Sequence, residues 1–394
     1  MSNYFDSCIH KGVYQKRAII NPMNHPPLAE PIWVDTPAVF DNMLADISRQ
    51  SQLAVDTESN SLYVFHEQVC LIQFSTEKQD YLVDTLAGLE LSVLESIFID
   101  VDIEKIFHAV EYDIVCLKRD FNFQFANLFD TMQAARILGW KQLGLSSMLA
   151  SQFGVRVNKR YQKANWGKRP LPPEMRDYAR LDTHYLIPLR QRLLAALREA
   201  KRHDLAQEDF RRLTQVQSKP NHRPACTCIK GYNHLTQRQL AVLQELCAYR
   251  ERKARVANLP PFKIIGNPTL LELAQTCPQT HEQLAALKKL SHKLYKRHAQ
   301  GLLDAVRCGL DMPFIKSKHR PRPSNVYIDR LERLKDWRKQ AARRMGVQSD
   351  VILPRDVLDL IAKKNPRSQA ELQALMQDLP ARFTRFGEQV LAIL

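Results

Sequence analysis

The sequence contains no long apolar run. No stretch approaches the roughly 18 uncharged, apolar residues that a helix needs to cross a bilayer. The first residues, MSNYFDSCIHKGVYQK, also lack the basic segment followed by an apolar segment that marks a secretion signal. These absences argue against a membrane-spanning or exported protein, and we expect a cytoplasmic protein with no membrane partner.

A regular cysteine pattern is also missing. Eight cysteines are scattered over 394 residues, which is unlike a disulfide framework, so we interpret them as reduced thiols. Cys226 and Cys228, flanked by His222 and His234, suggest a zinc site. Because C-x-C is shorter than the usual zinc spacing and the segment has the composition of a linker, zinc is the weaker interpretation.

The second half of the chain lacks acidic charge. Residues 1–200 contain 21 Lys and Arg and 24 Asp and Glu, a net charge of −3, whereas residues 201–394 contain 36 and 18, a net charge of +18. The two sum to the +15 of the whole chain. The asymmetry indicates a second half that binds a polyanion, or alternatively a solvated basic surface. A chain of this length also predicts two or three domains.

Against this background, four acidic residues stand out in three separate segments. Asp56 and Glu58 lie in LAVDTES, Asp113 in FHAVEYDIVCL and Asp182 in DYARLDTHYL. Residues 53–55 predict the end of a strand, so the first two side chains, at i and i+2, project from one face. Two close carboxylates repel each other unless a cation lies between them. Tyr178 precedes Asp182 by one turn of a predicted helix that continues to residue 186.

The predicted ligands are all oxygen atoms, which favours Mg²⁺ or Mn²⁺ over zinc. Two such ions, about 3.5 to 4 Å apart, can activate water and stabilise the leaving oxygen of an in-line displacement. Phosphodiester hydrolysis is the reaction that uses both effects. The sequence therefore predicts a metal-dependent hydrolase with two ions in its active site.

These segments resemble the three exonuclease motifs of the DEDD superfamily, and their order resembles the ribonuclease D family. The matching pieces are VDTES with LIQFST, KIFHAVEYDIVCL, FDTMQAARILG, NWGKRPL and YARLDTHYL, which together cover about residues 50 to 190. The resemblance implies a ribonuclease H-like fold with a mixed sheet. It also implies metal ligation by Asp56, Glu58, Asp113 and Asp182, with Tyr178 positioning or deprotonating the attacking water. Asp177 occupies the position of the histidine in the other branch, which indicates the tyrosine branch.

The second half repeats itself at a fixed offset of 88 residues. Without a gap, Leu246, Tyr249 and Arg250 correspond to Leu334, Trp337 and Arg338, and the register continues to Leu303 and Leu391. Such a register predicts two helical domains, each with its own small core. Both copies resemble the HRDC domain, which implies nucleic-acid handling. The two aromatic residues could stack on bases, but a place in the core is the favoured interpretation.

The expected organisation is an α/β domain followed by all-α domains. We expect an N-terminal arm over 1–30, an exonuclease domain over 31–214, a linker over 215–233, an HRDC domain over 234–310, a second linker over 311–325 and a second HRDC domain over 326–394.

Further residues are candidates for substrate binding. Trp166, Lys168 and Arg169 in NWGKRPL could grip the 3′ end of a nucleic acid, or could anchor the loop. His108 could approach a phosphate, although a structural role is favoured. Arg160 and Asn165 replace residues that are often Ser and Asp in the family, near the expected substrate mouth.

The family resemblance implies a 3′–5′ exoribonuclease that releases nucleoside 5′-monophosphates from RNA, with precursor tRNA 3′ ends as substrates and a monomer as the favoured state. Two alternatives stay open. One is an exonuclease that acts on DNA, because a metal site does not read the 2′-hydroxyl. The other is a non-catalytic RNA-binding scaffold.

Overall fold

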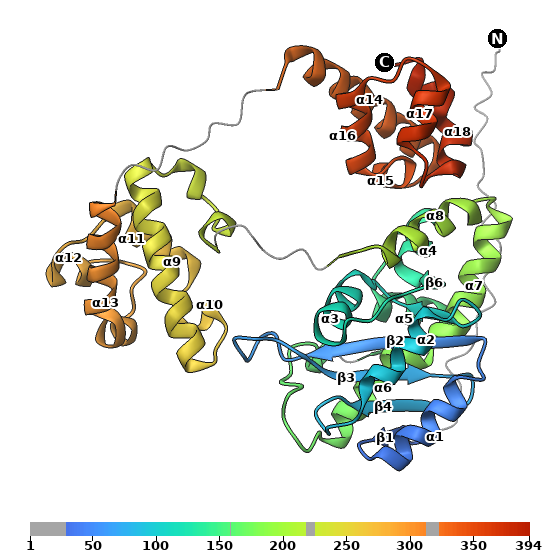
Figure 1. Ribbon diagram of the computed structural model, residues 1–394, viewed down its shortest axis with the longest axis horizontal. Coiled ribbons are helices and arrows are strands. Elements are labelled where there is room, and N and C mark those ends of the chain that lie inside the picture. The colour runs from blue at the N-terminus through green and yellow to red at the C-terminus, as the bar shows by residue number, and fades with distance from the viewer. Residues whose placement is uncertain (1–28, 158, 218–224, 313–322) are drawn as a thin grey trace, which may run out of the picture.

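The computed structural model describes residues 29–157, 159–217, 225–312 and 323–394 (Figure 1). Nearly all of the expected N-terminal arm and the middle of each expected linker lie outside these ranges. Within them, no helix combines the length and apolar character needed to span a membrane.

The first half of the chain is built on a mixed six-stranded sheet, as expected. The strand order is β1 (Ile32–Val34), β4 (Asp80–Asp84), β3 (Val69–Ser75), β2 (Gln52–Ser59), β5 (Glu104–Phe107) and β6 (Leu128–Asp130). β2 pairs antiparallel with β3 and parallel with β5. Every residue of β3 and β4 is buried, because helices cover both faces of the sheet.

Successive side chains of β2 point to opposite faces of the sheet, and each face has its own hydrophobic core. Leu53 and Val55 face a cluster that contains residues of α1 (Pro37–Ile47), α2 (Glu95–Ile99) and α3 (Glu111–Phe121), with η1 (Leu91–Leu94) before α2. Ala54 faces the other cluster, formed with α4 (Thr131–Leu138), α5 (Leu145–Phe153), α7 (Leu186–Glu199) and α8 (His203–Thr214). Since side chains alternate along a strand, Asp56 and Glu58 share the face of Ala54.

The predicted helix around Tyr178 is divided in the structure. α6 (Pro173–His184) begins after Pro172 and ends at His184, and α7 begins at Leu186. Tyr185 lies between them with φ −97° and ψ 2°. Pro188 explains the break, because it has no N–H to donate to the carbonyl of His184. Continuation of one stripe to residue 186 was therefore wrong, whereas Tyr178 and Asp182 do share α6.

The second half forms two helical bundles that repeat each other at the predicted offset. The first contains α9 (Gln237–Ala257), α10 (Pro261–Ile264), α11 (Asn267–Thr276), α12 (His281–Ala285) and α13 (His292–Asp311), preceded by η3 (Ala225–Cys228) and η4 (Tyr232–His234). The second contains α14 (Asn325–Met345), α15 (Ser349–Ile352), α16 (Arg355–Lys364), α17 (Gln369–Leu375) and α18 (Pro380–Leu391). The first residue of each helix from α14 to α18 lies 88 positions after that of its counterpart.

Equivalent side chains also make equivalent contacts in the two bundles. Arg250 donates to the carbonyl of Ile265 at 3.2 Å, and Arg338 donates to the carbonyl of Leu353 at 2.9 Å. Tyr249 and Trp337 are 7% and 8% exposed and lie in the two cores. The core interpretation of these two aromatics is confirmed.

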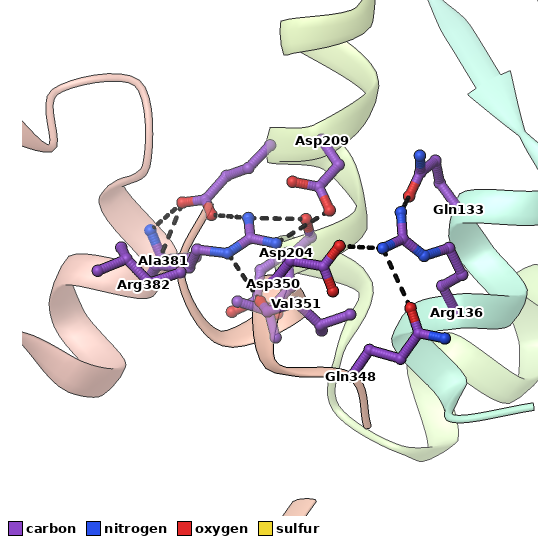
Figure 2. Close-up of polar contacts among 12 residues, drawn as sticks. Gln133, Arg136, Asp204, Asp209, Gln348, Asp350, Val351, Ala381 and Arg382 are labelled. Atoms are coloured by element: carbon purple, nitrogen blue, oxygen red, sulfur yellow. Dashed lines mark hydrogen bonds and ion pairs between the residues drawn. The ribbon is translucent and has the colours of Figure 1, made fainter. Parts of the chain in front are cut away.

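The second bundle docks on α8 of the sheet domain (Figure 2). The fully buried guanidinium of Arg382 donates to Glu208 at 2.7 Å, to Asp209 at 2.9 Å and to the carbonyl of Val351 at 3.0 Å. Glu208 is also fully buried. Loss of one partner of such a pair commonly costs about 3 to 5 kcal/mol, because the other charge stays buried.

Two glycines bring the backbones of these domains together. Gly139 has φ +81°, and a Cβ atom there would lie 2.3 Å from the carbonyl oxygen of Gly346. A side chain at position 139 would therefore separate the second bundle from the sheet domain.

The first bundle contacts the sheet domain through other residues. Asn258 accepts a hydrogen bond from the amide of Phe65 at 3.2 Å, and the ammonium of Lys263 lies 4.2 Å from the centre of the Tyr63 ring.

Candidate active site

Strand β2 carries the first two carboxylates. Asp56 and Glu58 lie within β2, opposite Gln73 and Leu71 of β3, and the register shifts only after Glu58. The strand thus continues to Ser59, beyond the predicted end near residue 55, because its pairing with β3 continues. The two side chains project from one face, as predicted.

Asp113 lies in the first turn of α3, where the helix dipole favours a negative charge. Its Oδ1 atom accepts a 2.5 Å hydrogen bond from the hydroxyl of Thr57. Thr57 stands between Asp56 and Glu58 but points to the opposite face of β2, toward α3. One strand therefore supplies two carboxylates and also holds a third.

The helix α6 carries the remaining two residues. The hydroxyl of Tyr178 donates a hydrogen bond to Asp182. Tyr178 is 7% exposed, and its ring packs beside those of Trp166 and Tyr161, at centroid distances of 6.1 and 5.9 Å. The phenol is thus fixed against the carboxylate rather than free to rotate.

The electrostatics of the four carboxyl groups show that they converge. Burial, together with the charges of the other three carboxylates, raises the pKa of Asp56 well above its ordinary value. Burial and the charges of Asp182 and Asp113 do the same to the pKa of Glu58. Burial raises the pKa of Asp113 and of Asp182 to about 7. Such a cluster strongly favours a cation that would relieve the repulsion.

The donor set fits a hard divalent cation. The converging ligands are carboxylate oxygens, which suit Mg²⁺ or Mn²⁺. Among the described residues, no three His, Cys, Asp or Glu side chains are already drawn to metal-ligand geometry.

The burial of Tyr178 also bears on its chemistry. Burial, with the charges of Asp182, Glu58 and Asp56, raises the pKa of the Tyr178 phenol far above its ordinary value. The phenol is therefore neutral near pH 7. A neutral phenol that donates to Asp182 can accept a hydrogen bond from water, but it is a poor proton acceptor.

The predicted substrate-binding residues of the loop before α6 lie outside the quartet of acidic residues, which is Asp56, Glu58, Asp113 and Asp182. Trp166 is 1% exposed, and Lys168 is exposed on the loop before α6. Arg169 donates to both carboxylate oxygens of Asp84 at 2.6 Å, and to the carbonyls of Cys70, Trp166 and Lys168. These contacts support the loop-anchoring alternative for Arg169. Substrate contact by these three residues stays a prediction.

His108 has a structural partner. Its Nδ1 atom lies 2.9 Å from the hydroxyl of Thr131 at the start of α4. Burial lowers the pKa of the imidazole, which favours its neutral form. These contacts support the structural interpretation, and a phosphate contact by His108 stays a prediction.

The cysteine segment lies apart from the quartet. Cys226 and Cys247 are buried in the core of the first bundle, where a hydrogen bond joins their side chains, and Cys228 is exposed. His222 lies outside the described residues. Every described cysteine is a free thiol.

Sequence reasoning missed two residues beside the quartet. The hydroxyl of Thr57 holds Asp113, and Gln73 is a fully buried amide opposite Asp56. A signal for Gln73 was available, because it is the one amide in the otherwise apolar run VCLIQF. The hydrogen bond of Thr57 depends on the distance between β2 and α3, which the sequence does not provide.

Comparison with known proteins identifies the family. Residues 31–198 match the 3′-5′ exonuclease family model, and residues 239–306 and 328–394 each match the HRDC domain. The chain belongs to the ribonuclease D-like family. It therefore combines a 3′–5′ exonuclease domain of DEDD type with two HRDC domains, which are the two helical bundles.

Individual relatives agree with this assignment. Protein RRP6-like 2 of Arabidopsis thaliana is 32% identical over 281 residues, which cover 67% of this chain and 32% of that protein. The matched segments cover about two thirds of this chain. They span only about a third of the length of each of these curated relatives. The crystal structure of the catalytic core of RRP6 from Trypanosoma brucei has a TM-score of 0.62 and 28% identity, covering 72% of this chain and 80% of that one.

A structure of lower sequence identity covers more of the chain. Escherichia coli RNase D has a TM-score of 0.66 and 22% identity, covering 89% of this chain and 100% of that one. At this identity the likeness concerns the fold.

Proposed function

We propose that this protein is a 3′–5′ exoribonuclease that hydrolyses RNA from the 3′ end and releases nucleoside 5′-monophosphates. The observation that carries the proposal is the convergence of four carboxylates with a phenol that is bonded to one of them. A non-catalytic scaffold gains nothing from burying four groups that raise one another's pKa, since such a cluster lowers stability.

In this proposal, Asp56, Glu58, Asp113 and Asp182 hold two divalent cations. Asp56 and Asp182 would share one ion, and Asp56 would hold the second with Glu58 and Asp113. The ions would supply activation of water and charge stabilisation at the leaving 3′ oxygen.

The remaining chemistry belongs to the side chains. The neutral phenol of Tyr178 donates a hydrogen bond to Asp182, and its oxygen can still accept a hydrogen bond from the attacking water. We therefore assign Tyr178 to orienting that water, and not to removing its proton. Thr57 and the helix dipole of α3 keep Asp113 in place.

RNA is the proposed substrate, with precursor tRNA 3′ ends as the natural class. The support is indirect: among the relatives are an exosome complex exonuclease of Saccharomyces cerevisiae and an exoribonuclease involved in structured RNA processing. The basic second half of the chain would hold the body of such an RNA. A cytoplasmic, monomeric protein is part of the same proposal.

The test is an assay of the purified full chain on a 3′-extended tRNA and a matched single-stranded DNA. Each substrate is incubated with Mg²⁺, Mn²⁺ or EDTA, and the products are resolved by size and by end group. The proposal requires metal-dependent shortening of the RNA to 5′-monophosphates. Preferential digestion of the DNA would favour the DNA exonuclease, and binding without digestion in either metal would favour the scaffold.

A further inference from the structure

Gln73 is a buried polar residue without a visible partner. It lies in the middle of β3 and is 0% exposed. Neither its Oε1 nor its Nε2 atom has a hydrogen-bond partner among the described residues. An unpaired buried amide commonly costs about 1 to 3 kcal/mol, so native proteins retain few of them without a reason.

The sheet register identifies the neighbours of this amide. On the same face, Gln73 is flanked by Asp56 across β2 and by Leu82 across β4. Along its own strand the same-face neighbours are Leu71 and Ser75. The two leucines offer no polar atom.

The two polar neighbours are Asp56 and Ser75, and the hydroxyl of Ser75 already has hydrogen-bond partners. Its hydroxyl donates to Asp80 at 2.6 Å and lies 2.7 Å from the hydroxyl of Thr183 on α6. The carboxyl group of Asp56 is therefore the polar neighbour toward which the amide can act. It is also the carboxylate that both proposed cations would share.

The helix α6 closes the space above Gln73. It contacts β3 through Thr183 at one end, and through Tyr178 and Ala179, which pack in one cluster with Leu71, at the other. Gln73 thus lies on the strand that packs beneath the helix carrying Tyr178 and Asp182. Its side chain projects from the same sheet face as Asp56, its neighbour across β2.

We propose that Gln73 is a positioning residue of the metal site, whose carboxamide hydrogen-bonds to the Asp56 carboxylate or to water held by a divalent cation there. This inference rests on the proposed function. Mg²⁺ in proteins usually keeps several waters, which donate hydrogen bonds to nearby acceptors, while its carboxylate ligands accept hydrogen bonds from nearby donors. A carboxamide supplies both: Oε1 accepts from a cation-bound water, while Nε2 donates to a carboxylate. The amide then has its partners in the metal-bound protein.

The experiment compares Gln73→Met with the wild-type full chain. Methionine keeps the length and the unbranched shape of the side chain and removes both polar atoms. Gln52→Met is the matched control: it is the same change on the same sheet, at the far end of β2, where the amide donates to Glu104 at 3.3 Å. For each protein, Mn²⁺ affinity is measured by isothermal titration calorimetry without substrate, and Tm is measured in EDTA.

We expect Gln73→Met to weaken Mn²⁺ binding by about 10- to 100-fold, the range typical of residues that orient metal ligands. In EDTA its Tm should equal or exceed that of the wild type, because an unpaired buried amide has been removed. Gln52→Met should bind Mn²⁺ as the wild type does. If Gln73→Met does not fold, Gln73→Leu is measured in its place, with the same expectations.

Two outcomes would overturn the inference in distinguishable ways. If Gln73→Met gains stability in EDTA and binds Mn²⁺ within twofold of the wild type, Gln73 is only an unpaired core amide, and the proposed function stands. If the wild type itself binds no Mn²⁺ while remaining folded, the metal site and the role of Gln73 both fail.

Discussion

The hydroxyl of Thr57 donates a 2.5 Å hydrogen bond to Asp113, and so joins the strand of the first carboxylates to the helix of the third. This bond lowers the pKa of Asp113 and opposes the effect of burial. A metal ligand must be ionised, so in the proposed metal site this bond would favour cation binding as well as hold the position of Asp113.

Thr57→Val should weaken Mn²⁺ binding by about 10-fold or more, because valine keeps the shape of threonine and loses the hydroxyl. The pH below which Mn²⁺ affinity falls should also be higher, because loss of the hydrogen bond raises the pKa of Asp113. Thr57→Ser, which retains a hydroxyl, is the control. Calorimetric titration between pH 6 and pH 8 checks both effects, and equal behaviour of the two variants would contradict the role of this bond.

Asp56→Asn and Asp182→Asn should each abolish hydrolysis, since loss of a ligand removes several kcal/mol of charge stabilisation from the transition state. RNA binding at low salt should persist in both. Asp177→Asn, on the exposed side of α6, should retain wild-type activity. The measurement is single-turnover digestion of 3′-labelled RNA at saturating Mg²⁺, where near-normal rates for either ligand variant would refute the assigned metal site.

Tyr178→Phe should lower kcat by about 10²- to 10⁴-fold and leave KM nearly unchanged, because a water-orienting group acts in the chemical step. The buried ring remains, so Tm should change little. Steady-state kinetics and a thermal melt together separate this role from a packing role. A loss of stability with normal kcat would make Tyr178 a core residue only.

The raised pKa values of Asp113 and Asp182 predict an unusual dependence of stability on pH in EDTA. Between about pH 4 and pH 7 the folded protein holds protons that the unfolded chain has lost, so the free energy of unfolding should fall as pH rises. Asp182→Asn should therefore melt a few degrees above the wild type at pH 8, and the difference should shrink at pH 5. If Asp182→Asn and the wild type melt at the same temperature at both pH values, repulsion between the carboxylates does not destabilise the folded protein.

The basic surface of the first bundle gives a prediction about RNA. Lys293, Lys296 and Arg297 are exposed on α13. Replacing all three by glutamine should make tRNA binding less salt-dependent, by up to about 0.9 in the slope of log K against log salt for each lost phosphate contact. The same loss of charge on α14, at Arg333, Lys335 and Lys339, controls for net charge. A merely solvated surface predicts unchanged slopes.

Much of this architecture could be predicted, because it depends on local patterns. The i, i+2 spacing of Asp56 and Glu58 and the one-turn spacing of Tyr178 and Asp182 each fix a shared face once the element is known. The 88-residue register likewise predicted the second set of helices from the first. Contacts between distant segments were not predictable in this way, since no periodicity relates Glu208 to Arg382 or Asp56 to Gln73.

That limit affects the design of experiments. Cutting the chain near residue 215 is a natural test of the second half when only the sequence is known. The structure shows that this cut would remove the second bundle from α8 and strip Glu208 of its partner. Loss of activity after such a cut would then reflect a damaged sheet domain, so substitutions on exposed helices are the sounder test.

The ion pair of Arg382 also distinguishes the two copies of the repeated domain. At the 88-residue offset, Arg382 corresponds to Leu294, and Ala381 and Arg385 correspond to Lys293 and Arg297. In the second bundle this face lies against the carboxylates of α8, with Arg385 bonded to Asp204. In the first bundle the equivalent face keeps its cations and lacks the buried arginine. One copy of the repeated domain therefore uses this face to bind the sheet domain, whereas the equivalent face of the other copy leaves Lys293 and Arg297 exposed to solvent, where a polyanion could reach them.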